Sequence, residues 1–240
     1  MITLLDYGAG NVRSVINAIE KLGGTVHIAS GPADIYNAEK LVFPGVGNFG
    51  SMMQVLREKG YIEALTAYLR EDRPFLGICL GLQALFEESE EAPGVKGLGI
   101  IPGLVKRFDT NLSVPHIGWN GIVIQQETDM FNQLSGSEKF YFVHSYHVVP
   151  AEPTAVLTST TYEESFVSSI KTGNIVATQF HPEKSGGAGL VVFQNFIRLQ
   201  TGQPAALRRQ KETRLAKRIV ACLDVRANDA GDLVVTKGDR

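Results

Sequence analysis

The sequence predicts an α/β fold with a mostly parallel sheet and helices on both faces. Three observations lead to this prediction. Short apolar runs alternate with helical periodicity in the first half of the chain, and several of these runs end abruptly in glycine-containing loops. The middle of the chain changes to short strands between turn signals, which predicts an antiparallel extension of the sheet.

The first half of the chain repeats a strand, a loop and a helix. Residues 2–6 form a short apolar run, and after the loop at 7–11 the apolar residues from 12 to 22 recur at helical spacing. Further strands are predicted at 26–29, 40–43 and 74–78, and further helices at 53–69 and 80–86. This alternation is typical of parallel strands joined by helices.

The second half contains fewer helices. Strands are predicted within 94–105, 118–124, 140–149 and 175–180, and a helix at 190–199 closes the first domain, which we expect to cover residues 1–201. Residues 202–214 are polar and basic, as in a linker. The remaining stretch, 215–240, holds two strand-like segments at 219–225 and 233–237, and because two strands alone are marginally stable, it resembles the beginning of an incomplete domain.

Composition narrows the class of protein. The 240 residues are 44% hydrophobic and 20% charged, which is ordinary for a globular chain. A net charge of -2 with dispersed Lys and Arg argues against binding to nucleic acid or to a membrane. Two cysteines, Cys79 and Cys222, are too few for a disulfide scaffold, and no apolar run approaches the roughly 20 residues of a membrane span. We therefore expect a soluble intracellular protein.

Cys79 is the first candidate for chemistry. It stands in Gly77-Ile78-Cys79-Leu80-Gly81, where small residues two positions to either side permit a sharp turn from strand to helix and leave the side chain exposed. The N-terminus of the following helix favours a thiolate. A buried core cysteine is the alternative, since most free cysteines are of that kind. The pentapeptide alone does not decide between the two.

His181-Pro182-Glu183 strengthens the catalytic interpretation. Residues i and i+2 of an extended segment project to the same side, and Pro182 keeps the segment from becoming helical. A cysteine nucleophile needs an imidazole to take and return a proton, and it benefits from a third group that orients the base. The alternative is a histidine with only a structural hydrogen bond, which the adjacent carboxylate makes less favoured.

A loop after a predicted strand, Pro44-Gly45-Val46-Gly47, could supply an oxyanion hole. Its glycines leave backbone N–H groups free to approach a ligand, although a simple tight turn would explain them equally well. The carboxyl ends of parallel strands gather at one edge of a sheet, so this loop should meet Cys79 and His181 there.

Two other patterns do not support the ligand sites that they first suggest. The stretch from Gly8 to Arg13 begins like a dinucleotide-binding loop, but Arg13 stands where the third glycine is needed. His144 and His147 lie on a predicted strand without the cysteine or carboxylate spacing of a zinc site. No metal and no cofactor are predicted.

Taken together, these motifs resemble the triad-type glutamine amidotransferases, which implies the class I, flavodoxin-like version of the predicted fold. More narrowly they resemble the glutaminase half of the imidazole glycerol phosphate synthases of histidine biosynthesis. The resemblance spans residues 2 to about 200 and rests on the segments at 6–11, 44–48, 77–83, 115–120, 142–146 and 181–186.

The resemblance implies a role for each matching residue. Cys79 would attack the glutamine amide, His181 would move the protons and Glu183 would orient His181. The oxyanion would be held by backbone N–H groups of Leu80 and of the Gly45-Val46-Gly47 loop, and glutamine by Gln83, Ser145 and Tyr146. Trp119, Tyr141 and Lys184 would lie at a surface for the cyclase that receives the ammonia.

The tail resembles the first strand of that cyclase, a (βα)8 barrel. Asp224 matches a catalytic acid or base of the barrel, Arg218 its gate and Lys237 a charged residue near the gate, and none could work without the other strands. The resemblance is strongest to the fused plant and fungal type. It implies a chain cut just inside its second domain, cytoplasmic as it stands or in the chloroplast if a transit peptide was removed.

Two other functions remain open. A stand-alone cysteine hydrolase of the γ-glutamyl type needs the same nucleophile and imidazole but no acceptor domain. A catalytically silent module that binds or regulates a cyclase would need no nucleophile at all. The docking motifs and the tail disfavour the first, and the complete triad disfavours the second.

Overall fold

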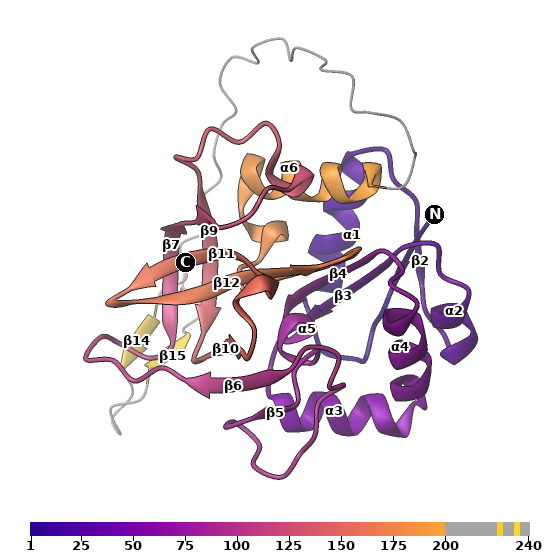
Figure 1. Ribbon diagram of the computed structural model, residues 1–240, viewed down its shortest axis with the longest axis horizontal. Coiled ribbons are helices and arrows are strands. Elements are labelled where there is room, and N and C mark those ends of the chain that lie inside the picture. Colours follow the sequence, from indigo (N-terminus) through magenta and orange to yellow (C-terminus); the bar gives the residue numbers. More distant parts are fainter. Residues whose placement is uncertain (200–224, 228–232, 236–240) are drawn as a thin grey trace, which may run out of the picture. The chain divides into compact units, whose positions relative to one another are not determined.

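The computed structural model describes residues 1–199, 225–227 and 233–235 (Figure 1). The chain divides into two compact units, Met1–Gly202 and Gln203–Arg240. In the second unit, β14 (Val225–Ala227) and β15 (Leu233–Val235) pair antiparallel. Cys222 and the predicted cyclase residues Arg218, Asp224 and Lys237 lie outside the described residues.

Five parallel strands form one half of the main sheet, as predicted. They lie in the order β2-β1-β3-β4-β13, and every neighbouring pair among them is parallel. Their bounds are Ile2–Leu4 for β1, Val26–Ile28 for β2, Leu41–Gly45 for β3, Phe75–Cys79 for β4 and Ile175–Thr178 for β13. The carboxyl ends of these strands therefore share one edge of the sheet.

The predicted antiparallel extension is also confirmed. From β13 the sheet continues through β12, β10 and β6, each antiparallel to the one before, while β11 and β8 pair beside β12 and the short β5 pairs parallel with β6. Their bounds are Glu88–Ser89 (β5), Gly103–Arg107 (β6), Val123–Ile124 (β8), Tyr146–Pro150 (β10), Val156–Tyr162 (β11) and Glu164–Thr172 (β12). A separate ribbon pairs β7 (His116–Gly121) with β9 (Lys139–His144).

Helices cover both faces of the parallel half (Figure 1). One face packs against α1 (Val12–Lys21) and α6 (Gly186–Arg198), and the other against α2 (Pro32–Tyr36), α3 (Phe49–Glu58) and α4 (Tyr61–Arg70). The alternation of side chains along β3 explains this division, since Leu41 and Phe43 belong to one buried cluster and Val42 to the other. The short elements are α5 (Leu80–Gln83), η1 (Asp129–Phe131), η2 (Pro153–Ala155) and η3 (Pro182–Lys184).

Several predicted bounds were wrong. The helix expected at 53–69 is two helices, α3 and α4, because Gly60 between them adopts a left-handed conformation with φ of 68°. The helix expected at 80–86 ends at Gln83. Most of the stretch 94–105 is irregular, with positive φ at Gly94 and Gly99, and becomes a strand only at Gly103. Strands β11 and β12 were not predicted.

Candidate active site

Cys79 occupies a strained turn between β4 and α5. Its φ is 55° and its ψ is -104°, a conformation that a side-chain-bearing residue seldom adopts. The flanking glycines make the turn possible, since a Cβ atom at Gly77 would lie 2.7 Å from the Gly81 carbonyl oxygen, and one at Gly81 would overlap the Phe43 carbonyl. The predicted strand-to-helix turn is therefore present, but Cys79 is only 6% exposed, so the expectation that the turn leaves its side chain exposed was wrong.

The three predicted loops meet at the carboxyl edge of the parallel strands. In the register of β3 and β4, Gly45 stands opposite Cys79. In the register of β13 and β4, Thr178 stands opposite Ile78, so the chain reaches His181 just beyond the same edge. Sheet topology thus brings together residues that are about 100 positions apart in sequence.

His181 and Glu183 form a buried pair. His181 Nδ1 donates a hydrogen bond of 2.8 Å to Glu183 Oε1, and both side chains are 1% exposed. Asn11 Nδ2 donates to the same carboxylate oxygen at 3.3 Å. These contacts fix the imidazole tautomer and direct Nε2, which has no hydrogen-bond partner among the described residues, away from the carboxylate.

The charges around His181 favour its protonated form. Burial alone would lower the pKa of His181, but the negative charges of Cys79 and Glu183 together outweigh burial and raise this pKa above its ordinary value. Cys79 therefore lies close enough for a thiolate to interact with the imidazolium. Such a pair can deliver a proton to a leaving group while the thiolate acts as nucleophile.

Two glutamines support the thiol, and only one of them was predicted. Gln179 Nε2 lies 3.6 Å from Cys79 Sγ as a donor. Gln83 Nε2 donates at 3.2 Å to the Gln179 side-chain oxygen and also to the Tyr146 carbonyl oxygen. Gln83 thus connects the predicted Ser145-Tyr146 segment to the residue that contacts the nucleophile.

A cavity of about 380 Å³ opens over Cys79 and His181. Most predicted site residues line it: Val46, Gly47, Cys79, Leu80, Gln83, Ser145, Tyr146, His181 and Lys184. Gly45 and Glu183 are not in its lining but hold neighbours that are. Glu91 also lines the cavity, and sequence reasoning missed it, although its carboxylate accepts a hydrogen bond of 2.8 Å from Phe49 N–H at the start of α3.

The three residues expected at a docking surface are grouped together. Trp119 on β7 is 50% exposed and meets Tyr141 on β9 edge to face, with ring centroids 5.8 Å apart. Lys184 Nζ lies 5.6 Å from the centroid of the Tyr141 ring. Ile117, on the same strand as Trp119, is 60% exposed. An exposed aromatic and aliphatic group of this kind is typical of interaction surfaces.

His144 and His147 lie in a packed aromatic cluster. Both surround Phe108, together with His116, and burial lowers the pKa of all three histidines, that of His144 to about 3. Over the described part of the chain, no three His, Cys, Asp or Glu side chains are gathered as a metal ion would require. These histidines therefore pack as neutral rings.

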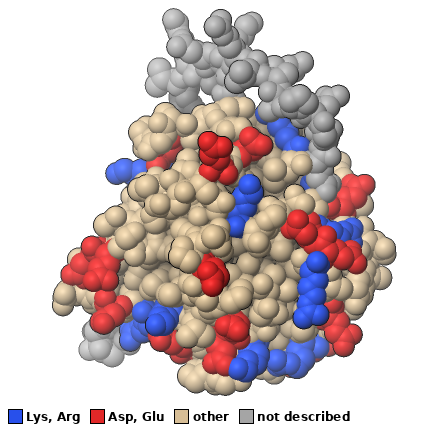
Figure 2. Space-filling view, in the orientation of Figure 1, with Lys and Arg blue, Asp and Glu red and all other residues tan. Residues whose placement is uncertain are grey.

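Charge distribution on the surface is relevant to binding of nucleic acid, and helix length and polarity are relevant to crossing a membrane. Figure 2 shows acidic and basic side chains interspersed on the visible face, with no broad patch of one sign. Within residues 1–199, 225–227 and 233–235, no helix is long and apolar enough to cross a bilayer.

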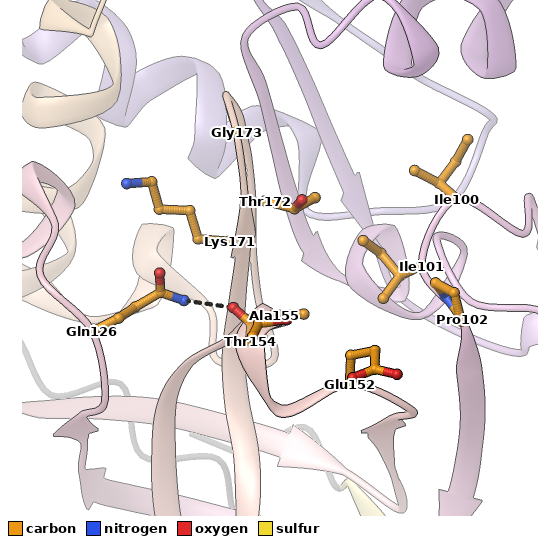
Figure 3. Close-up of a pocket in the computed structure, with 10 residues that line it drawn as sticks. All are labelled: Ile100, Ile101, Pro102, Gln126, Glu152, Thr154, Ala155, Lys171, Thr172 and Gly173. Atoms are coloured by element: carbon orange, nitrogen blue, oxygen red, sulfur yellow. Dashed lines mark hydrogen bonds between the residues drawn. The ribbon is translucent and has the colours of Figure 1, made fainter.

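A second cavity, of about 400 Å³, lies away from the carboxyl edge (Figure 3). Its lining includes Lys171 near the end of β12, Gly173 in the turn between β12 and β13, and Gln126, whose Nε2 donates to the Thr154 carbonyl oxygen at 3.4 Å. This is the amino edge of the parallel strands. Neither a cysteine nor a histidine lines this cavity, and none of its lining residues belongs to the arrangement around Cys79.

Sequence comparisons identify similar proteins of two kinds, long hisHF proteins and a shorter HisH subunit. The family described as glutamine amidotransferase class-I matches residues 3–199. Imidazole glycerol phosphate synthase hisHF, chloroplastic, of Arabidopsis thaliana is 52% identical over the whole chain, which spans 41% of that protein. The hisHF protein of Schizosaccharomyces pombe is 48% identical, and the chain spans 47% of it. Subunit HisH of Syntrophotalea carbinolica is 46% identical over 82% of this chain and 98% of its own length.

Solved structures support the fold. A crystal structure of a glutamine amidotransferase superposes with a TM-score of 0.66 at 18% identity, covering 82% of this chain and 97% of that one. PurLQS from Thermotoga maritima superposes with a TM-score of 0.64 at 18% identity, with the same coverage. The chain spans less than half the length of the fused relatives and nearly the full length of the separate subunit.

Proposed function

We propose that this chain, which belongs to the class-I glutamine amidotransferase family, hydrolyses glutamine to glutamate and ammonia and supplies the ammonia to a cyclase of histidine biosynthesis. The observation that carries the proposal is the meeting of three groups at one sheet edge. Cys79 stands in a strained elbow, His181 lies beside it, and Glu183 holds His181 at 2.8 Å.

The proposed reaction has two halves. The Cys79 thiolate attacks the amide carbon of glutamine, and the carbonyl electrons move onto oxygen, where backbone N–H groups of Leu80 and the Gly45-Val46-Gly47 loop stabilise them. The oxyanion then collapses to a thioester as the carbon–nitrogen bond breaks. His181 gives its proton to the departing ammonia.

Water completes the cycle. His181 takes a proton from the water molecule, whose oxygen attacks the thioester carbon. The carbon–sulfur bond breaks, glutamate leaves and the thiolate returns. Glu183 keeps the imidazole oriented in both halves, and Asn11 supports Glu183.

The proposed substrate fits the lining of the cavity. An acidic side chain, Glu91, and a basic one, Lys184, both line it, so it offers partners for the amino and carboxylate groups of an amino acid. Gln83 and the Ser145-Tyr146 segment are proposed to hold the rest of glutamine.

The proposed partner is a cyclase domain of the kind that we expect in the longer imidazole glycerol phosphate synthase hisHF relatives. Residues 1–201 are the amidotransferase domain in this proposal, residues 202–214 a linker and residues 215–240 the start of a (βα)8 cyclase, with Asp224 one of its catalytic residues. Trp119, Tyr141 and Lys184 form the docking surface. The name of the Arabidopsis relative places that protein in the chloroplast, and a location of this chain in the cytoplasm or a plastid stays a prediction.

The test is release of glutamate from glutamine by the full chain, alone and with a cyclase domain that holds its nucleotide substrate. We expect activity to rise sharply with the occupied cyclase. Cys79→Ala should abolish activity under every condition while circular dichroism shows an intact fold, and Cys222→Ala, which removes the only other thiol, should retain it.

Each contrary result favours a different function. Activity that persists in Cys79→Ala would contradict the assigned nucleophile. Equal activity with and without the cyclase would favour a stand-alone hydrolase of the γ-glutamyl type. No activity in either condition would favour a silent binding module.

A further inference from the structure

The hydroxyl group of Tyr7 makes two hydrogen bonds to one residue of the predicted oxyanion loop. It donates to the Val46 carbonyl oxygen at 2.7 Å and accepts from the Val46 N–H at 3.0 Å. Tyr7 follows β1 at the carboxyl edge and is 5% exposed, and its ring packs edge to face against Phe43. Both backbone polar groups of Val46 are therefore engaged by a single buried side chain.

This arrangement occupies a group that the proposed reaction needs. An oxyanion hole requires N–H groups that point at the position where negative charge develops. The Val46 N–H already donates to Tyr7, so it has to leave that bond before it can donate to an oxyanion. In the observed conformation the oxyanion hole lacks one of its proposed donors.

We propose that Tyr7 is a positioning residue whose hydroxyl holds Val46 in a resting conformation, and that the oxyanion hole is completed when this contact is released. The proposal rests on the proposed function, because it assigns a regulatory role within the same site. Tyr7 does not line the cavity and need not touch glutamine.

The surroundings of Tyr7 are suited to this role, and we call its hydroxyl contact with Val46 the latch. Burial raises the pKa of Tyr7, and the nearby Cys79 adds to this increase, so the hydroxyl keeps its proton and can donate and accept at once. Each of the two peptide groups that Tyr7 contacts has a glycine at one end, Gly45 or Gly47. Gly47 has a φ of 106°, in the region that glycine adopts without strain, which leaves the loop able to change conformation.

The first measurement is the rate of amide hydrogen exchange at Val46, which is monitored by NMR on the full chain. Tyr7→Phe removes the hydroxyl and keeps the ring, so exchange at Val46 should become several-fold faster. The matched control is Tyr68→Phe. Tyr68 is also buried and its hydroxyl donates at 2.7 Å to the Pro74 carbonyl oxygen, but it lies on α4 and its hydrogen bonds do not involve Val46. Exchange at Val46 should not change in this control.

The second measurement is glutaminase kinetics on the same proteins. Tyr7→Phe should raise kcat without the cyclase by about 5-fold, the scale of one neutral hydrogen bond, and leave KM within about twofold. The additional stimulation by the occupied cyclase should shrink in proportion. Tyr68→Phe should match the unmodified chain in both constants.

The outcomes separate the latch from the function. Unchanged exchange at Val46, or faster exchange with unchanged kcat in an active enzyme, would overturn the latch alone. A lower kcat in Tyr7→Phe would also overturn it, because the hydroxyl would then assist the oxyanion. An unmodified chain without glutaminase activity under any condition would reject the proposed function, and the role of Tyr7 with it.

Discussion

At the scale of a residue, the buried carboxylate of Glu183 affects both the orientation and the pKa of His181. It is 1% exposed, accepts from His181 Nδ1 and from Asn11, and raises the pKa of His181 together with Cys79. A buried charge is costly unless it is paired, so Glu183 is held in place by the same contacts through which it orients the imidazole. Its proposed role is to position His181 rather than to touch substrate.

Glu183→Gln tests this role. The change keeps the size of the side chain but removes its charge, so kcat should fall on the order of 100-fold while KM stays within about twofold. The pKa of His181 should also fall, because the carboxylate no longer favours the imidazolium, and the alkaline limb of kcat/KM against pH should move to lower pH. Glu20→Gln, an exposed carboxylate on α1, is the control. An unmoved pH profile would reject the assignment.

At the scale of an element, helix α6 is fitted closely against the segment that carries the triad. Gly189 is buried, and a Cβ atom there would overlap the Pro182 carbonyl group, next to Glu183. Gly187, two residues earlier on the same helix, is exposed and has no atom within 4 Å of an added Cβ. The helix thus contains one glycine that is tightly packed and one that has free space around it.

Gly189→Ala should lower the free energy of unfolding by about 1–3 kcal/mol, because the helix must move away from Pro182. It should also lower kcat, since Glu183 moves with its neighbour. Gly187→Ala should raise stability by at most about 1 kcal/mol through helix propensity and leave kcat unaltered. Urea unfolding followed by circular dichroism gives both values. Equal effects of the two substitutions would show that the close contact at Gly189 contributes neither to stability nor to kcat.

At the scale of the whole molecule, the proposed docking surface and the proposed catalytic residues are joined by hydrogen bonds of the Tyr141 backbone. The Tyr141 carbonyl oxygen accepts from His181 N–H at 2.9 Å, and Tyr141 N–H donates at 3.0 Å to Ser185 Oγ. Tyr141 also contacts Trp119 and Lys184 through its ring. A partner that shifts β9 would therefore act directly on the segment that holds His181.

Trp119→Ala should weaken binding to a cyclase domain by about 30-fold, the effect of losing a central aromatic contact worth roughly 2 kcal/mol. Titration calorimetry with the isolated cyclase measures the affinity. Tyr36→Ala is the matched control, since Tyr36 is 44% exposed on α2, at the other side of the molecule from β7 (Figure 1). Equal affinity of the Trp119 variant and the unmodified chain would place the cyclase elsewhere.

Much of the fold could be predicted from local patterns, and the errors in that prediction have physical causes. Four of the parallel strands, β1, β3, β4 and β13, were found because each is a short buried run, whereas β2 is a mostly exposed edge strand that was found from its Val and Ile residues. Strands β11 and β12 were missed because Ser and Thr fill many of their positions, and several of these hydroxyls are buried and bond to one another, as Thr158 does to Ser168 and Ser169. Local polarity in such strands is balanced only by pairing partners that lie elsewhere in the chain.

The chemical groups of the candidate site can be identified in the amino-acid sequence alone: a cysteine between permissive glycines, an imidazole two residues before a carboxylate, and a glycine-containing loop after a strand. The residues that support these groups become apparent only in the folded chain. Asn11 reaches Glu183 across 172 positions, Gln179 reaches Cys79 across 100, and Tyr7 reaches Val46 across 39. No local spacing encodes these contacts, because they arise where the carboxyl ends of separate parallel strands converge and a side chain's partner depends on sheet order and register.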